Sequence, residues 1–437
     1  MIHVRFDESD FQTSGLVAAI NRTIDVEAAR LGVAVGYGFR FRELIRAVAA
    51  THPSGRLVVL VDEYDKPIIN YLGDLAKAVE YRDLLRPFYG VLKGADEYLE
   101  LVFITGVSAF SKVSLFSDLN NIRQLTLDPL AHTLVGWTEA ELEANFAAQL
   151  NATGYSREEI RHWYNGYTWG GERVYNPWSV LNFLSARQLE DYWSMSGTPK
   201  FVTDILAREG VADLEGARRS PVQLTGFDLG SLDPAAILWQ GGYLTLDTKA
   251  SRGRFHALRY PNAEVRETFT EALLSSYGFG RVQANDRALR MEAALRSRDL
   301  DTFRDEVDAL LAAVPHELWR DATERFYHAT LLTAFRYVDG VEAEAEVSSA
   351  RSRADVVLRA EDIVYAIEFK LLRPTAKELA DETARVTAAE ALACEALQQI
   401  TERGYLDAYA TDPRERVALA VVFDAERRAV SVLREGE

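Results

Sequence analysis

RADVVLRAEDIVYAIEFKLL, the stretch from Arg353 to Leu372, decides the fold of the last part of the chain. Its two apolar runs are rich in β-branched residues and flank the polar turn 359–362, which predicts two adjacent strands joined by a hairpin-like turn. Three polar residues interrupt this apolar pattern. Lys370 comes two residues after Glu368 and shares its strand face, while Asp355 lies on the neighbouring predicted strand.

Two carboxylates and a lysine on adjacent strands are typical of a metal-dependent nuclease centre. Asp355 and Glu368 supply the oxygen ligands that a hard divalent cation prefers, and such a cation positions water or stabilises charge on phosphate. The Glu368-Phe369-Lys370 triplet alone would also fit an ordinary ion pair on an edge strand. Asp355, at the expected distance along the chain, favours the metal site.

A helical pattern with Ala396-Leu397-Gln398-Gln399-Ile400 follows, and Tyr405 stands six residues after Gln399. Together with Ser352-Arg353-Ala354-Asp355 and the Glu-x-Lys triplet, these motifs resemble the PD-(D/E)XK nuclease-like domain that ends a large group of prokaryotic AAA-ATPase-like proteins. The resemblance covers nearly the whole chain.

The resemblance implies an α/β restriction-endonuclease-like domain at the C-terminus. In it, Asp355 and Glu368 would bind Mg²⁺ or Mn²⁺, and Lys370 would be catalytic. Two further residues, Gln399 and Tyr405, would line the site. The family's acidic strand corresponds to Glu346, although Glu342 and Glu344 lie on the same strand face and compete for this role.

The apolar run 57–61 is followed at once by Asp62-Glu63-Tyr64-Asp65-Lys66-Pro67, which looks like a Walker B segment. In a P-loop nucleotidase, an acid at the end of such a strand contacts Mg²⁺ and the next Glu polarises the attacking water. A buried strand that simply meets solvent at charged residues would read the same way. By the resemblance, Asp62 and Glu63 would bind nucleotide.

Residues 101–108 read as a second buried parallel strand that ends at Thr105 and Ser108 and runs into the loop 109–121. This segment resembles the family's sensor strand and its following loop. Thr105 or Ser108 would then contact the terminal phosphate through a hydroxyl group. Alternatively, Thr105-Gly106 only ends the strand in a turn.

The N-terminus departs from the family, because no Gly-Lys dipeptide occurs in the 437 residues. Residues 1–7 look like the strand after the family's first β-α unit, so a Walker A segment is expected to be missing upstream. We therefore expect an incomplete P-loop-type parallel sheet, no ATP turnover by this chain, and ATP binding only if an upstream phosphate loop is restored. An open sheet edge predicts self-association. Two explanations stay open: a wrongly assigned start codon or partial gene product, or a true loss of the Walker A unit in a lineage that keeps the ATPase half as a scaffold.

The middle of the chain is dense in aromatic residues, with WYNGYTW at 163–169 and VYNPWSV at 174–180. They match the lid region of the family. Aromatic and Asn side chains could stack on bases, but packing of a small helical domain is favoured. Thr138 is expected to cap the first helix of this region, with Glu141 as its capping-box partner.

Length and a hydrophobic content of 48% predict two or three domains. We expect four segments. They are an AAA-ATPase-like α/β domain at 1–135, a helical lid at 136–260, a helical connector at 261–320 and the nuclease-like domain at 321–437.

Composition limits the partners of the protein. A net charge of −17, from 49 basic and 66 acidic residues, argues against tight, indiscriminate duplex binding, which depends on phosphate neutralisation. Local arginine groups could still contact DNA or simply be solvated, namely Arg351 and Arg353 beside the site and Arg252, Arg254 and Arg259.

The single cysteine, Cys394, lies in a helical pattern and is expected in the core. A reducing cytoplasm is the expected compartment. No apolar run approaches the roughly 20 residues that span a bilayer, and no membrane contact is expected.

Three functions therefore remain open. The first is a divalent-metal-dependent DNA nuclease coupled to a degenerate or truncated AAA-ATPase-like module. The second is a non-catalytic scaffold or interaction protein. The third is an ATP-binding AAA-type ATPase whose phosphate loop lies upstream of this chain's start.

Overall fold

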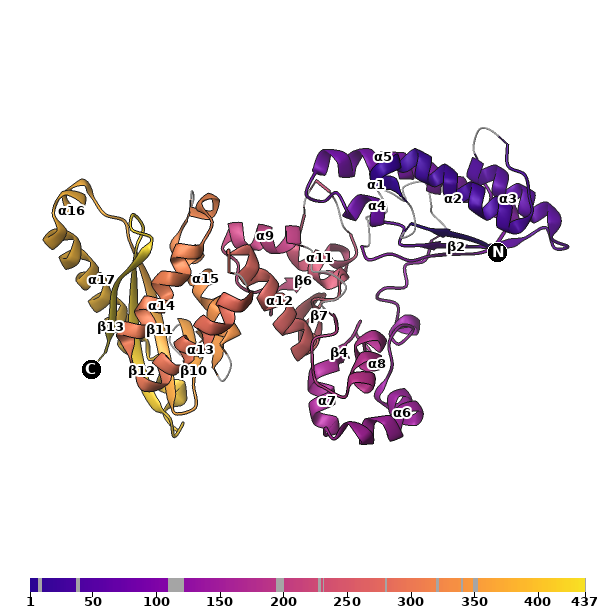
Figure 1. Ribbon diagram of the computed structural model, residues 1–437. Coiled ribbons are helices and arrows are strands. Elements are labelled where there is room, and N and C mark those ends of the chain that lie inside the picture. The colour runs from indigo at the N-terminus through magenta and orange to yellow at the C-terminus, as the bar shows by residue number, and fades with distance from the viewer. Residues whose placement is uncertain are drawn as a thin grey trace. The chain divides into compact units, whose positions relative to one another are not determined.

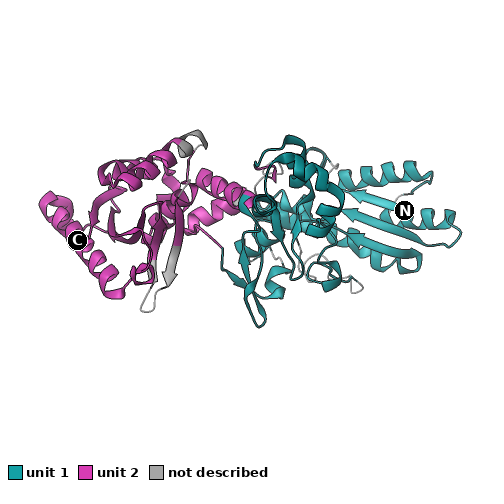
Figure 2. Ribbon diagram, turned by 90° about the horizontal axis from the view of Figure 1, so that it is seen from below, with its two compact units in different colours: residues 1–190, 215–263 teal, residues 191–214, 264–437 magenta. Residues whose placement is uncertain are grey.

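The structure is a computed structural model that describes residues 1–6, 10–36, 40–108, 122–193, 200–226, 229–230, 232–279, 281–319, 322–338, 341–348 and 353–436. Contacts divide the chain into two compact units, shown in two colours in Figure 2. Unit 1 comprises Met1–Glu190 and Glu215–Ala263, and unit 2 comprises Asp191–Leu214 and Glu264–Glu437. The finer division into four segments stays a prediction, because these contacts group the chain more coarsely.

Unit 1 begins with a three-stranded parallel sheet in the order β1-β2-β3, with strands Ile2–Arg5, Leu57–Asp62 and Leu99–Ile104. The alternate residues Leu57, Val59 and Val61 are buried, and helices cover this face of the sheet (Figure 1). The helices of this region are α1 (Phe11–Ser14), α2 (Leu16–Leu31), α3 (Arg40–Thr51), α4 (Lys66–Ile69) and α5 (Leu75–Lys93). The expected α/β class and parallel sheet are confirmed.

The third strand corrects one expectation, because β3 is not a buried strand. Among the described residues it pairs only with β2 and forms one edge of the sheet. Leu101 is 53% exposed and Phe103 is 38% exposed. The apolar run in the sequence fits a central strand, but the number of neighbouring strands depends on the tertiary fold.

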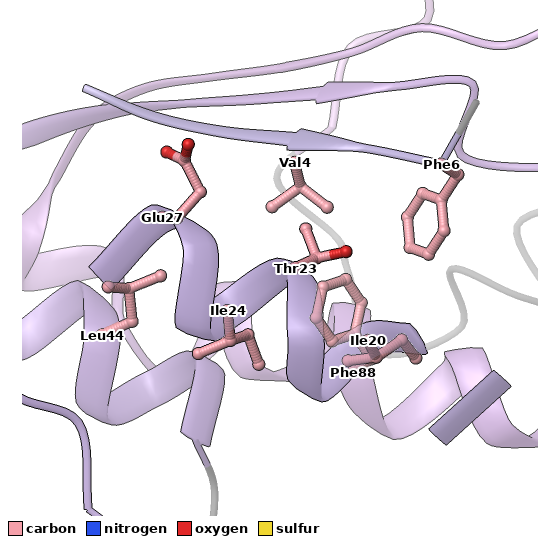
Figure 3. A pocket seen from close by; sticks show the side chains of 8 residues that line it. All are labelled: Val4, Phe6, Ile20, Thr23, Ile24, Glu27, Leu44 and Phe88. Atoms are coloured by element: carbon pink, nitrogen blue, oxygen red, sulfur yellow. The ribbon is translucent and has the colours of Figure 1, made fainter. Parts of the chain in front are cut away.

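The space between β1 and α2 is apolar and tightly closed. Val4 and Phe6 face Ile20 and Ile24 across it, and no room remains for a water molecule (Figure 3). Glu27 borders this space, and its carboxylate accepts a hydrogen bond of 3.0 Å from the backbone N–H of His3. This space is therefore part of the core of unit 1.

The rest of unit 1 consists of short helices and small antiparallel sheets. The predicted capping box is confirmed, since Thr138 and Glu141 bond reciprocally at the start of α6. Most of the aromatic side chains pack inward, for example Tyr164, Tyr175 and Phe183, whereas Trp178 is 54% exposed. The elements are α6 (Glu139–Thr153), α7 (Arg157–Tyr164), β4 (Asn165–Tyr167), β5 (Val174–Tyr175), α8 (Pro177–Ala186), β6 (Arg218–Arg219), α10 (Pro221–Leu224), α11 (Pro234–Gln240), β7 (Thr245–Arg252) and β8 (Phe255–Arg259).

Unit 2 contains a five-stranded sheet in the order β13-β12-β11-β10-β9. Strands β9, β10 and β11 form an antiparallel meander, β12 runs parallel to β11, and β13 returns antiparallel to β12. The strands are β9 (Glu342–Ser348), β10 (Arg353–Arg359), β11 (Ile363–Leu372), β12 (Glu415–Asp424) and β13 (Ala429–Glu435). The helices are α9 (Lys200–Glu209), α12 (Ala263–Ser276), α13 (Arg281–Ser297), α14 (Leu300–Ala313), α15 (Glu324–Tyr337), α16 (Ala376–Ala380) and α17 (Glu382–Arg403).

Helix α17 makes the crossover between β11 and β12 and lies close against the sheet. Ala389, Ala393 and Ala396 form a stripe of small residues that packs on Ala420 and Val422 of β12. Small side chains allow the helix backbone to approach the strands closely. A buried ion pair, with Arg385 Nε at 2.6 Å from Asp424 Oδ2, joins the start of α17 to the end of β12.

The opposite face of this sheet carries aromatic residues from the helix that precedes it. Tyr327 of α15 stacks on Phe423 of β12 at a centroid distance of 4.7 Å, and Phe369 of β11 lies 5.7 Å from Phe423. The order of α15, three strands, α17 and two strands agrees with the expected restriction-endonuclease-like domain. The sheet is thus held between α15 and α17.

Cys394 was expected in the core, but this is wrong. It is exposed on α17, because Ala393 beside it takes the buried position.

None of the helices in the described parts of the chain is long and apolar enough to cross a membrane.

Candidate functional site

The site lies where strands β10 and β11 separate. Their antiparallel pairing runs from Arg359↔Val364 to Val356↔Ile367. At the next position, Oδ2 of Asp355 accepts a hydrogen bond of 3.0 Å from the backbone N–H of Phe369. A side chain therefore takes the place of a ladder bond, and polar groups of both strands meet at this point.

Glu368 is the most buried acid of the site, with only 2% of its surface exposed. Its Oε1 accepts hydrogen bonds from Lys370 Nζ, at 3.3 Å, and from Gln399 Nε2. Its Oε2 is buried and has no hydrogen-bond donor among the residues that the structure describes. A buried carboxylate oxygen without a protein donor is unfavourable, and a water, an ion or a ligand that meets it removes this penalty.

The electrostatics of the site lead to the same conclusion. Burial, and then the negative charge of Asp355, raise the pKa of Glu368 to about 7, although Lys370 and Arg403 act in the opposite direction. Protonated and ionised forms of Glu368 therefore coexist near neutral pH. A bound cation would favour the ionised form of both carboxylates.

Lys370, Gln399 and Tyr405 form one hydrogen-bonded network with Glu368. Lys370 Nζ donates to Gln399 Oε1 at 3.1 Å, and Gln399 Nε2 donates to the hydroxyl group of Tyr405 at 2.9 Å. The structure thus brings together all five residues that the sequence predicted for this site. Their catalytic and metal-binding roles stay predictions.

Tyr405 reaches Gln399, which stands six residues earlier in the sequence, because of the way α17 ends. Gly404 adopts a left-handed conformation with φ 62°, and its N–H donates to the carbonyl group of Thr401. The N–H of Tyr405 donates to Ile400, which completes a Schellman motif. This turn folds Tyr405 back against the helix, where it packs with Ile400 and reaches Gln399.

The residues present fit a hard divalent cation. Mg²⁺ is usually held by one or two carboxylates, together with waters and substrate phosphate. Asp355 and Glu368 provide two carboxylates, and Glu368 Oε2 is the oxygen that lacks a donor. In the part of the chain that the structure describes, no group of three or more His, Cys, Asp or Glu side chains could hold a metal.

The three acids of β9 differ in their surroundings. Arg359 of β10 pairs with both Glu342 and Glu344, at 2.8 and 2.5 Å, so these two acids are engaged away from the site. The backbone of Glu346 lies opposite Asp355, between the pairs Ala354↔Val347 and Val356↔Ala345. The side chain of Glu346 is outside what the structure describes, and its role stays a prediction.

Sequence reasoning missed two residues of α15. His328 Nε2 lies 3.1 Å from the carbonyl oxygen of Asp355, and its ring lies 5.3 Å from that of Phe369. The carboxylate of Glu324 accepts a hydrogen bond from the N–H of Leu371 and experiences the charges of Lys370 and Asp355. His328 lies 27 positions before Asp355 and Glu324 lies further away still, so no local pattern could have identified them.

A second acid cluster lies at the end of β2 in unit 1. Thr105 Oγ1 donates to Asp62 Oδ1 at 2.6 Å, as does the N–H of Glu63 at 3.1 Å. Glu63 pairs with Lys66 Nζ at 2.7 Å. The strand ends β2 and β3 thus meet as expected, and nucleotide binding by Asp62, Glu63, Thr105 and Ser108 stays a prediction.

Asp65, which was not among the predicted residues, joins the two strand ends. It is fully buried and accepts hydrogen bonds from the N–H groups of Val107, at 3.2 Å, and Ser108. Burial raises its pKa to about 6, although these hydrogen bonds act to lower it. A Cβ atom at Gly106 would collide with Asp65 and Tyr64, so this close approach requires glycine. The expected sensor loop 109–121 lies outside the described residues.

The arginine groups give little support for a DNA surface. Arg351 lies outside the described residues, as does the side chain of Arg353. Arg259 donates to the carbonyl oxygens of Gly166 and Tyr260, each at 3.1 Å, and Arg252 donates to that of Lys249 at 2.8 Å. These two arginines therefore stabilise local backbone in unit 1.

Comparison with known proteins agrees with both regions. Residues 1–116 match the family described as predicted AAA-ATPase, and residues 322–432 match the PD-(D/E)XK nuclease superfamily. A protein of Azotobacter chroococcum mcd 1, described as an uncharacterized protein in the vnfD 5'region, is 35% identical over 400 residues. The match covers 90% of this chain and 73% of that relative. No solved structure gives a significant match.

The two matches fall on the two regions in which the acid clusters lie, and the relative aligns across both of them. The chain therefore belongs to the family of proteins that join an AAA-ATPase-like domain to a C-terminal PD-(D/E)XK nuclease-superfamily domain.

Proposed function

We propose that the C-terminal domain is a DNA nuclease that hydrolyses phosphodiester bonds with Mg²⁺ or Mn²⁺. The superfamily generally uses divalent metal ions. One observation carries the proposal for this chain: Glu368 is buried beside a second carboxylate, and no described residue donates to its Oε2. Such a pair is unfavourable by itself and becomes favourable when a cation binds.

Each residue then has a defined task. Asp355 and Glu368 would hold the metal ion, which would supply an activated water and neutralise charge on the phosphate. Lys370 places its ammonium group beside the scissile phosphate. Gln399 fixes both Lys370 and Glu368 through its amide group, and Tyr405 fixes the orientation of that amide. His328 holds the backbone of Asp355 in place.

The direct test is a cleavage assay on single-stranded, duplex and branched DNA with Mg²⁺ or Mn²⁺, with and without ATP. Wild type is compared with Asp355→Asn and with Glu390→Gln, an exposed acid of α17 that pairs with Arg434 away from the site. We expect cleavage by wild type and by the Glu390 variant and none by the Asp355 variant. Equal activity in all three proteins would show that another site, or a contaminant, cleaves the DNA.

Metal binding is measured separately by titration calorimetry. If Mn²⁺ binding gives a heat signal with wild type but not with Asp355→Asn, the metal site is supported. This result holds even if none of the tested DNA molecules is a substrate. Neither metal binding nor cleavage would instead support the scaffold function, in which both domains keep their folds without turnover. The comparison with and without ATP tests whether the AAA-ATPase-like domain affects cleavage.

A further inference from the structure

The end of α17 places an exposed cation, Arg403, beside the site. Its Nη1 donates to the hydroxyl group of Tyr405 at 3.4 Å. That hydroxyl group is 2.9 Å from Gln399 Nε2, which also donates to Glu368. Two side chains therefore link Arg403 to the buried carboxylate.

Arg403 and Lys370 are two described cations whose charges act on Glu368, and they lie at different depths. Lys370 is mostly buried and bonds to Glu368 and Gln399. Arg403 is exposed, and the charges of both Glu368 and Asp355 act on it. A phosphate group that approaches from solvent can therefore meet Arg403 without displacing the inner network.

The position of Arg403 is fixed by the backbone. It is the last residue of α17, and the left-handed Gly404 follows it in the Schellman motif that also orients Tyr405. Arg403 and Tyr405 are thus held in one turn. The guanidinium group suits phosphate, because its planar donors can bond to two oxygens at once.

We propose that Arg403 binds a phosphate of the DNA backbone next to the bond that is cleaved. This inference rests on the proposed nuclease function for the identity of the ligand. In a chain with a net charge of −17, a cation at this position offsets the repulsion between the site's carboxylates and the DNA backbone. A purely structural role is the alternative, since a cation at a helix C-terminus also stabilises the helix dipole.

The test measures DNA binding without turnover, in the Lys370→Ala protein, which keeps both carboxylates. A labelled duplex is titrated in Mg²⁺ at several salt concentrations, and fluorescence anisotropy gives the Kd. The Lys370→Ala protein is compared with three double variants, in which Lys370→Ala is combined with Arg403→Ala, Arg403→Lys or Arg427→Ala. Arg427 is the matched control, a half-exposed arginine of the β12–β13 turn that pairs with Glu382.

We expect Arg403→Ala to raise the Kd about five- to tenfold and to reduce the slope of log Kd against log salt by about one. Arg403→Lys keeps the charge but not the paired donors, so its affinity should lie between those of Arg403 and Arg403→Ala, and Arg427→Ala should change nothing. An Arg403→Ala protein that melts at a lower temperature but binds DNA normally would show the helix-end role and overturn the inference.

The two proposals can fail separately. If wild type cleaves no DNA but Arg403→Ala still weakens binding selectively, the nuclease proposal fails and the phosphate contact stands. If wild type cleaves DNA and Arg403→Ala changes neither KM nor Kd, the nuclease proposal stands and the phosphate contact is wrong.

Discussion

The two acid clusters of this protein are built from the same residue types but differ in how their oxygens are satisfied. At the end of β2, Asp62 accepts two hydrogen bonds, Glu63 pairs with Lys66, and Asp65 accepts backbone N–H groups. Between β10 and β11, by contrast, Glu368 keeps one oxygen without a donor and lies beside Asp355. The first arrangement holds a loop in place, and the second leaves an acceptor for a cation.

This difference implies opposite effects on stability. Burial raises the pKa of both Asp65 and Glu368. Asp65 offsets this penalty by accepting buried backbone N–H groups, whereas Glu368 also lies beside the charge of Asp355 and is destabilising when ionised until a cation binds. Sites built for function often carry such a penalty. Substitutions in the two clusters should therefore separate into those that lower stability and those that lower activity.

The largest expected effect is on activity. Lys370→Ala removes the cation from the network with Glu368 and Gln399, so cleavage should fall by a factor on the order of a thousand or more. Little packing is lost, and the melting temperature should stay close to that of wild type. Rates from single-turnover cleavage, with Glu390→Gln as the control, check this. A rate within tenfold of wild type would place the catalytic cation elsewhere.

Next comes the loss of stability in the other cluster. Asp65→Ala leaves the N–H groups of Val107 and Ser108 without their buried acceptor and should lower the free energy of unfolding by roughly 3–4 kcal/mol. Hydrogen exchange of β2 and β3 measures the effect within unit 1. If the amide groups of β2 and β3 exchange as slowly in Asp65→Ala as in wild type, Asp65 does not hold the two strand ends together. The proposed contrast between the two acid clusters would then be wrong.

The pH dependence of Glu368 sharpens the comparison. Its folded-state pKa of about 7 lies above the usual 4.5, so the folded state holds the proton more tightly and stability falls as the pH rises from about 4.5 through 7. Glu368→Gln removes this dependence. Between pH 4.5 and pH 8, the variant should gain roughly 3 kcal/mol relative to metal-free wild type.

Urea unfolding of unit 2 at the two pH values, in the presence of a chelator, measures this gain. Adding Mn²⁺ should stabilise wild type and leave Glu368→Gln unchanged. If the free energy of unfolding changes with pH in the same way in both proteins, the pKa of Glu368 is not raised by folding. The site would then carry no penalty that a bound cation could remove.

A smaller effect is expected at the turn that orients Tyr405. Gly404→Ala places a side chain at φ 62° and against the carboxylate of Asp407, which should lower stability by about 1–2 kcal/mol. Combining it with Asp407→Ala should relieve the collision but not the backbone strain. Thermal unfolding of both variants separates the two contributions, and a full recovery in the double variant would contradict the strained-turn account.

The smallest effect belongs to the surface ion pair of the first cluster. Lys66 and Glu63 are both partly exposed, and Lys66→Ala should change the free energy of unfolding by less than about 0.5 kcal/mol. Chemical denaturation of this variant beside Asp65→Ala measures the contrast. A loss as large as that of Asp65→Ala would show that the exposed pair, rather than the buried acid, holds this cluster.

Local sequence patterns predicted several features that the structure contains. The two apolar runs rich in β-branched residues and the turn 359–362 indicated the β10–β11 hairpin, and the capping box of Thr138 and Glu141 is present. The resemblance placed Gln399 and Tyr405 at the site, and Gln399 bonds to both Glu368 and Tyr405. These features depend on residues that are close in sequence or on motifs with a fixed spacing.

Other features could not be read from local patterns. Glu324, His328 and Arg403 reach the site from helices whose position depends on packing against the sheet, and Asp65 reaches the end of β3 from the loop after β2. The apolar sequence of β3 fits a central strand, yet Leu101 and Phe103 are exposed at a sheet edge. Cys394 was wrongly predicted to lie in the core. The face of α17 that is buried depends on how the helix packs on the sheet, and Cys394 lies on the other face.

By itself, the sequence determined which residue types stand at which strand positions, since side-chain alternation and turn chemistry act over a few residues. From this came Asp355, Glu368 and Lys370 as candidate residues, whereas the α/β class and the placing of Gln399 and Tyr405 at the site came from the resemblance to a known family. Only the tertiary structure decided which carboxylate oxygens find donors. That outcome depends on groups far apart in the chain, because hydrogen-bond partners and burial are set by packing and not by sequence neighbours.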